Sequence, residues 1–174
     1  MTAIGKNGPI GRVKLSAMLG ESERKVRSIV DRLKEEGIVR ASKEAGSELA
    51  SKRLYSLIQS ITCIENSGHY IVAASIDKEL LAILRERYLT ARDYLVIELK
   101  DASLLKALML AEESRIEAPG MPREYVDMYL GLARKIVSQE GLGQALILIF
   151  EAKRYNCLHL AAYTIHMLYL ICNR

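Results

Sequence analysis

The stretch from Ser22 to Gly37, SERKVRSIVDRLKEEG, decides the fold of the first third of this 174-residue chain. Its apolar residues recur at the i, i+3, i+4 and i+7 spacing that forms one stripe along a helix: Val26, Ile29, Val30 and Leu33. Ser22 is a favoured N-cap residue, and Gly37 suits the left-handed position that follows a helix. The stretch therefore predicts one amphipathic helix with defined ends.

The side of this helix that faces away from the apolar stripe is basic. Its polar positions are Arg24, Lys25, Arg27, Ser28, Arg32 and Lys34. Upstream, RVKLSAML at 12–19 predicts a short helix, and Gly20 with Glu21 predicts a tight turn. Two helices joined by a short glycine-containing turn are typical of a helix-turn-helix, and a basic second helix is typical of a recognition helix.

The residues that follow predict a wing. Residues 38–40 form a short β-type run, 43–46 can turn, and 47–49 can pair back. Residues 51–61 carry apolar side chains at helical spacing and predict a closing helix. We therefore expect a winged-helix domain over residues 1–64.

The excess positive charge of the chain lies in this segment. Residues 1–60 carry 12 Lys/Arg and 7 Asp/Glu, a net +5, whereas residues 61–174 carry 13 and 14, a net −1. A polyanionic partner, double-stranded DNA, is the natural interpretation. We predict base contacts from Arg27 and Ser28 in a major groove. We predict phosphate contacts from four further residues: Arg12, Lys14, Lys25 and Lys43. Arg24 and Arg32 complete the predicted DNA-binding set.

The segment GPIGRVKLSAMLGESERKVRSIVDRLKEEGIVRAS resembles the N-terminal winged helix of an archaeal family of putative transcriptional regulators with a C-terminal domain of unknown function. The later stretch ALILIFEAKRYNCLHLAAYTIHM is similar, more weakly, to that family's last strand and helix. The resemblance covers about the first third of the chain and implies DNA binding by the first domain.

One feature departs from that pattern. A winged helix usually begins with a helix whose apolar face completes a three-helix core. Here the segment MTAIGKN before Gly8 is too short for such a helix. We therefore expect the first helix to be truncated or missing. The apolar face at Leu15, Val26 and Val30 should then be left incompletely covered, for a partner subunit or the second domain to fill.

Residues 68–174 predict a separate domain of α+β class, a small α/β sandwich. Nearly all-apolar runs at 70–75, 94–99 and 145–150 predict buried strands. Helices are expected after Asp77, over 122–139 and over 154–172, and the last is apolar on all sides. Such a helix suits both a core and a dimer interface. Residues 102–114 favour a helix, with a β-hairpin partner for 94–99 as the alternative.

Few residues in the chain suggest reaction chemistry. His159 and His166 are seven residues apart, too far to share a metal ion, and no phosphate-binding loop, nucleophile elbow or paired-cysteine motif occurs. The three cysteines lack paired spacing, which favours buried thiols in a reducing, cytoplasmic setting. Three arginines near the end of one helix could bind an anion, although a solvated helix end is favoured: Arg85, Arg87 and Arg92.

The sequence thus predicts a cytoplasmic transcriptional regulator that is not an enzyme and needs neither a metal nor another cofactor. The second domain is expected to form a homodimer and is a candidate sensor of a small-molecule effector. No membrane association is expected, since the last helix is too interrupted for a span. Two alternatives stay open. The winged helix could be a docking surface in a protein-interaction module, or it could be appended to a small-molecule-binding protein or enzyme.

Overall fold

The computed structural model describes residues 9–35, 39–42, 46–49, 56–113, 115–152 and 155–172. The chain divides into two units, Met1–Ser56 and Leu57–Arg174. The predicted boundary at residues 64–68 is wrong, because it falls inside a hairpin of the second unit.

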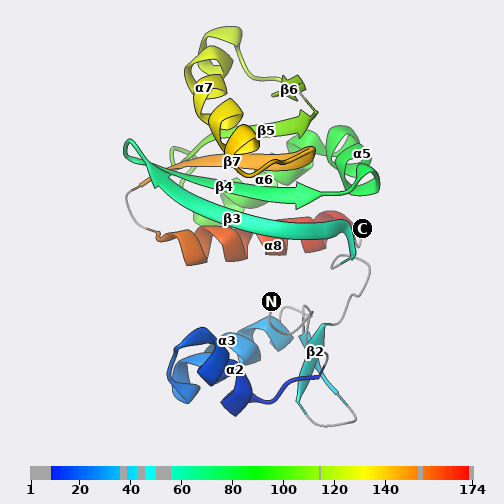
Figure 1. Cartoon of the computed structure of the whole chain (residues 1–174), viewed down its shortest axis with the longest axis vertical. Helices are drawn as coiled ribbons and strands as arrows, with labels where there is room; N and C mark the ends of the chain where they lie inside the picture. The colour runs from blue at the N-terminus through cyan, green and yellow to red at the C-terminus, as the bar shows by residue number, and fades with distance from the viewer. Residues whose placement is uncertain are drawn as a thin grey trace. The chain divides into compact units, whose positions relative to one another are not determined.

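Within its described residues, the first unit contains two helices and a two-stranded hairpin (Figure 1). Helix α2 (Arg12–Leu19) ends at Gly20, whose φ of 63° is left-handed, and α3 (Glu23–Glu35) follows directly. The Ser22 hydroxyl accepts a hydrogen bond from the Lys25 amide at 3.3 Å, as expected of an N-cap. Strand β1 (Val39–Ala41) pairs antiparallel with β2 (Ser47–Leu49).

A glycine allows the chain to close beside this hairpin. The backbone of Ile10 bridges to Ser47, with N–O distances of 3.1 and 3.0 Å. Gly46 has a φ of 106°, and a Cβ there would lie 2.7 Å from the carbonyl carbon of Ile10. Only glycine satisfies both the backbone angle and the close approach, so Gly46 fixes the segment before α2 against β2.

The apolar face of α3 is covered within the chain. Leu15, Val26 and Val30 are each at most 2% exposed, where α3 packs against α2 and β1. The prediction that this face would be incompletely covered, for a partner subunit or the second domain to fill, is therefore wrong. Among the described residues of this unit, the exposed large apolar side chains are instead Val13, Met18 and Ile29. The segment before residue 9, where a first helix was expected to be missing, lies outside the described residues.

The second unit is built on a five-stranded antiparallel sheet. Its strand order is β3 (Ile58–Asn66), β4 (His69–Ile76), β7 (Gln144–Glu151), β5 (Leu105–Glu112) and β6 (Arg115–Glu117). Helices α5 (Lys78–Glu86), α6 (Tyr88–Leu99) and α8 (Cys157–Cys172) cover one face, and α7 (Arg123–Gln139) covers the other (Figure 1). The prediction that helices and strands combine in an α+β fold is confirmed by this mixed structure with an antiparallel sheet.

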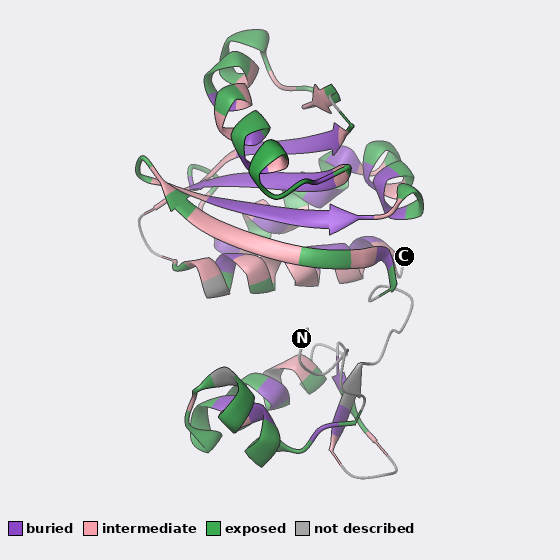
Figure 2. Cartoon of the chain, viewed as in Figure 1, coloured by how far each residue is buried: buried purple, intermediate pink, exposed green. Residues whose placement is uncertain are grey.

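The three central strands are buried on both faces, as Figure 2 shows. Odd-numbered residues such as Ile147 and Ile149 pack with α7, against Tyr129, Ala133 and Ile136. The intervening residues point to the other face because side chains alternate along a strand. Sheets covered on both faces have nearly continuous apolar strands, which explains why β4 and β7 were recognisable from sequence.

Three predicted elements are wrong. The closing helix predicted for 51–61 is contradicted at residues 58–61, which belong to β3, while residues 51–55 lie outside the described part. Residues 94–99 are helical, since Tyr88, Ala91, Leu95 and Leu99 form one buried stripe. Residues 105–112 are a strand, as in the alternative, but they pair with β7 and β6 and not with 94–99.

The prediction of unpaired, buried cysteine thiols is also wrong. Cys63 on β3 and Cys157 at the start of α8 form a disulfide, with a Cα–Cα distance of 5.6 Å. Sequence spacing could not show this pairing, because the two residues are 94 positions apart. The cysteines therefore no longer indicate a reducing compartment, because two of the three form a disulfide.

Helix α8 has one face on the sheet, as predicted. Leu160, Met167, Leu168 and Ile171 are at most 1% exposed, and the Thr164 hydroxyl between them donates to the Leu160 carbonyl at 2.8 Å. His159 and Ala162 lie on the exposed side. That this side contacts a second copy of the chain stays a prediction. No helix within the described residues is long and apolar enough to cross a membrane.

Candidate functional site

The outer face of α3 presents a row of polar and basic side chains. Arg24, Lys25, Arg27 and Ser28 are all exposed, on the side opposite the buried Val26 and Val30. A 13-residue α-helix spans about 20 Å at 1.5 Å per residue, enough to cross a nucleic-acid groove. The predicted recognition residues on this helix are thus brought together on an accessible surface.

Ion pairs along α3 leave most of this charge in solvent. The Lys25 ammonium contacts Glu21 at 2.6 Å, and the Arg27 guanidinium contacts Glu23 at 3.7 Å. Both pairs are exposed and can exchange with another anion at little cost, because exposed pairs contribute at most about 1 kcal/mol. Arg24 makes no ion pair with any residue that the structure describes. Its guanidinium is therefore available to bind a phosphate.

The remaining predicted contacts are only partly described. Arg12 and Lys14 are exposed on the first turn of α2. The side chain of Arg32 and the whole of Lys43 lie outside the described part of the chain. Seven Lys/Arg and four Asp/Glu lie between residues 12 and 35, a net +3 for the two helices.

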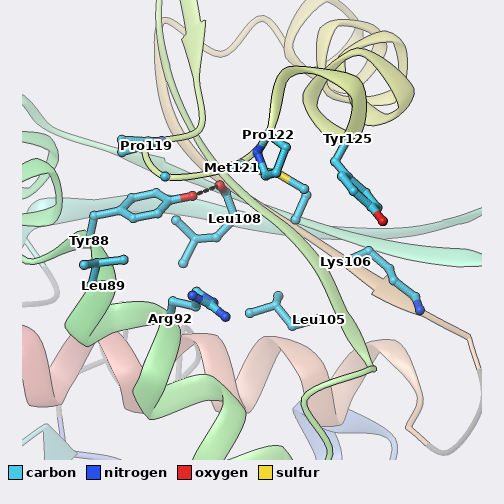
Figure 3. A pocket seen from close by; sticks show the side chains of 12 residues that line it. Tyr88, Leu89, Arg92, Leu105, Lys106, Leu108, Pro119, Met121, Pro122 and Tyr125 are labelled. Carbon is cyan, nitrogen blue, oxygen red and sulfur yellow. Dashed lines mark hydrogen bonds between the residues drawn. The ribbon is translucent and has the colours of Figure 1, made fainter.

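A second candidate site, which sequence reasoning missed, is a pocket at the edge of the sheet (Figure 3). It has a volume of about 220 Å³ and lies between α6, the first half of β5 and the loop at 118–122. Figure 3 shows Tyr88, Leu89 and Pro119 at one end and Lys106 and Tyr125 at the other. Since the pocket joins three separate segments of the sequence, no local pattern could have predicted it.

The Tyr88 side chain holds the inner end of this pocket. Its hydroxyl donates a short hydrogen bond to the Leu108 carbonyl on β5 (Figure 3). Burial raises the pKa of Tyr88 to about 12, with the nearby Arg92 guanidinium acting in the opposite direction. The phenol is therefore a neutral donor at physiological pH and ties α6 to β5.

We expect this phenol to make stability depend on alkaline pH. The folded-state pKa of Tyr88 lies above the unfolded value, so its contribution is complete below pH 10 and is lost as pH rises towards 12. Two pKa units correspond to at most about 2.7 kcal/mol. Urea unfolding at pH 9 and pH 11.5 should show a larger drop for the wild type than for Tyr88→Phe. Equal drops in the two proteins would refute this assignment.

The three arginines predicted near the end of one helix lie on two helices and have separate roles, because Arg85 and Arg87 end α5 whereas Arg92 belongs to α6. The Arg85 guanidinium binds Glu117 at 2.5 Å and Glu112 at 2.7 Å, and these hydrogen bonds raise its pKa. Arg87 donates to the Ile171 carbonyl at 2.9 Å. Arg85 and Arg87 thus join neighbouring elements, and neither forms a solvated helix end. Arg92 alone lines the pocket.

The described residues contain no group of three or more His, Cys, Asp or Glu side chains that could hold a metal ion. The Asn156 Oδ1 atom accepts a hydrogen bond from the His159 backbone amide and lies 2.9 Å from the His159 Nδ1 atom. The His166 Nδ1 atom lies 3.7 Å from a Glu98 carboxylate oxygen. His159 and His166, which were predicted not to share a metal ion, thus contact neighbouring polar side chains of the second unit.

Comparison with known proteins gives one structural similarity. No protein-family model matches the chain, and no curated protein matches it. The hypothetical protein PH0730 from Pyrococcus horikoshii OT3 has 22% sequence identity to it and a TM-score of 0.45. The match covers 98% of this chain and 89% of that protein.

Proposed function

We propose that the first unit is a winged helix-turn-helix that binds double-stranded DNA through α3. The observation that carries the proposal is the exposed row of Arg24, Lys25, Arg27 and Ser28 on a helix that follows a short left-handed turn. The β1–β2 hairpin beside α3 corresponds to the wing, which in such proteins lies against the backbone of the duplex. A regulator of transcription is the role that fits this arrangement.

In this proposal α3 enters the major groove. Arg27 and Ser28 would meet base edges, because they lie on the outer side of the first half of the helix. Arg12, Lys14 and Lys25 would contact phosphates on either side, together with Arg24, and Arg32 and Lys43 belong to the same predicted set. Binding would be largely electrostatic, since α2 and α3 carry more cations than anions.

The second unit would dimerise and set the spacing of two half-sites, with the exposed side of α8 as the contact surface. The protein would then prefer a palindromic duplex over a single half-site. The resemblance to an archaeal family of regulators implies a cytoplasmic location, because the DNA of such cells lies in the cytoplasm. The disulfide is compatible with this location, because intracellular proteins of hyperthermophilic archaea and bacteria are rich in disulfides.

An interaction role for the first unit is the second candidate. Val13, Met18 and Ile29 are between 40% and 69% exposed and would suit an apolar protein partner. The basic row on α3 favours DNA over this alternative, since a protein-docking surface needs no excess of cations.

Salt dependence tests DNA binding directly. We expect the full chain to bind a fluorescein-labelled random 25-base-pair duplex at 50 mM salt, measured by fluorescence anisotropy. Release of counterions from four phosphates would give a slope of about −4 in log K against log[salt]. Absence of binding at 50 mM salt would contradict the proposal, as would binding that does not weaken between 50 and 200 mM.

A further inference from the structure

We infer that the pocket between α6, β5 and the 118–122 loop binds a small organic anion, a carboxylate carried on an apolar body. This inference does not depend on the DNA-binding proposal, because it concerns residues of the second unit alone. It assigns a ligand class to a site that has no role in the DNA-binding proposal.

The charge of the pocket selects an anion. Among the twelve described residues that line it, Arg92 and Lys106 are cationic and none is acidic. Lys106 is already engaged, since its ammonium lies 2.9 Å from Glu151. Arg92 is exposed and makes no ion pair with a described residue, so its guanidinium is available for a carboxylate.

The position of α7 adds to this preference. The helix begins at Arg123, directly after Pro122 of the pocket wall, and has 17 residues. The positive end of its dipole therefore lies at the rim of the pocket. An anion held by Arg92 would experience a favourable field from two sides.

The walls of the pocket select an apolar body. Leu89 and Tyr125 lie at opposite ends of the pocket (Figure 3) and are 60% and 53% exposed. Met121 and Pro122 form the upper wall and Leu105 the lower one (Figure 3). A ring or a branched chain placed between them would cover surface that the folded chain leaves in water.

The size of the pocket limits the ligand. At ~30 Å³ for each water molecule in the liquid, 220 Å³ corresponds to roughly seven waters. This space accommodates an aromatic ring with a short acidic side chain and is too small for a nucleotide.

Residues 105–108 of β5 form the floor of the pocket. This half of β5 has an open edge, because β6 pairs only with Leu110, Ala111 and Glu112.

Phenylacetate is a suitable probe for the inference, and phenylacetamide is its neutral counterpart. We expect the full chain to bind phenylacetate in isothermal titration calorimetry, with a Kd in the range of about 0.1 to 1 mM given its ten heavy atoms. Phenylacetamide and acetate should each bind at least about tenfold more weakly, because one lacks the charge and the other the ring. In ¹H–¹⁵N spectra the shifted amides should include Ala107, Leu108, Gly120 and Met121.

Two variants of exposed arginines complete the test. Arg92→Gln should weaken phenylacetate binding at least about tenfold, whereas Arg134→Gln on the outer side of α7 should leave it unchanged. Thermal unfolding should confirm that both variants fold, since neither side chain is buried. The inference is overturned if phenylacetate does not bind below 10 mM, if phenylacetamide binds equally well, or if Arg92→Gln binds like the wild type. Each of these results leaves the DNA-binding proposal unaffected.

Discussion

Replacing Cys63 and Cys157 together with serine is expected to lower the free energy of unfolding of the second unit by about 4 to 5 kcal/mol. The two residues are 94 positions apart, so the bond closes a loop that includes most of this unit. In the chain-entropy account, closing a loop of that length removes about 4.7 kcal/mol of conformational freedom from the unfolded chain. That amount is a large share of the 5–15 kcal/mol typical of a whole domain.

Urea unfolding followed by circular dichroism measures the effect. The wild type with its disulfide reduced should unfold at the same urea concentration as the Cys63→Ser/Cys157→Ser variant. Cys172→Ser is the matched control, because Cys172 lies on α8 and takes no part in the disulfide. If the double variant and the wild type share one unfolding midpoint, the disulfide is either absent in solution or contributes nothing to stability.

The disulfide shows why part of this fold could not be read from the sequence. Its first cysteine lies on β3, and residues 58–61 of that strand carry apolar side chains whose spacing also fits a helix. The pairing of β3 with β4 decides between the two structures, and it depends on residues that lie beyond a local window. Once β3 is known to lie at the sheet edge beside α8, the approach of Cys63 to Cys157 follows.

Helix α6 and strand β5 show a related ambiguity. Residues 94–99 and 105–112 are both short apolar runs, and periodicity alone does not separate a buried strand from a buried helix of that length. In α6 the buried stripe starts at Tyr88, six residues before the apolar run at 94–99 that was predicted to be a strand. In β5 the helix-favouring residues are overridden by pairing with β7 along most of the strand.

Elements with strong signals at both ends were predictable. Helix α7 begins after Pro122 and ends before Gly141, and its buried face recurs at helical spacing. Strand β7 is apolar at every position from Ala145 to Phe150 because helices cover both faces of the sheet. The α3 surface was predictable for the same reason, since one amphipathic segment contains all of it. The pocket was not, because three separate segments supply its walls.

If α3 binds DNA, the variant Arg24→Gln/Arg27→Gln should bind a duplex at least about 100-fold more weakly than the wild type at 100 mM salt. Both side chains are exposed, and each arginine that contacts a base or a phosphate is worth about 1–3 kcal/mol. The slope of log K against log[salt] should also become shallower, by about one for each arginine that neutralises a phosphate. Glutamine is a good helix former, so α3 itself should persist.

The matched control is Arg134→Gln/Lys135→Gln, which removes the same charge from exposed positions of α7 in the second unit. If the protein attracted DNA through its net charge alone, both double variants would lose affinity equally. Recognition through α3 requires instead that the control bind within about twofold of the wild type, because exposed charges away from the contact surface are screened beyond ~10 Å at 0.1 M salt. Anisotropy with one duplex, compared across the three proteins, distinguishes these results. Equal affinity of the α3 variant and the wild type would reject the proposed surface, whichever value the control gives.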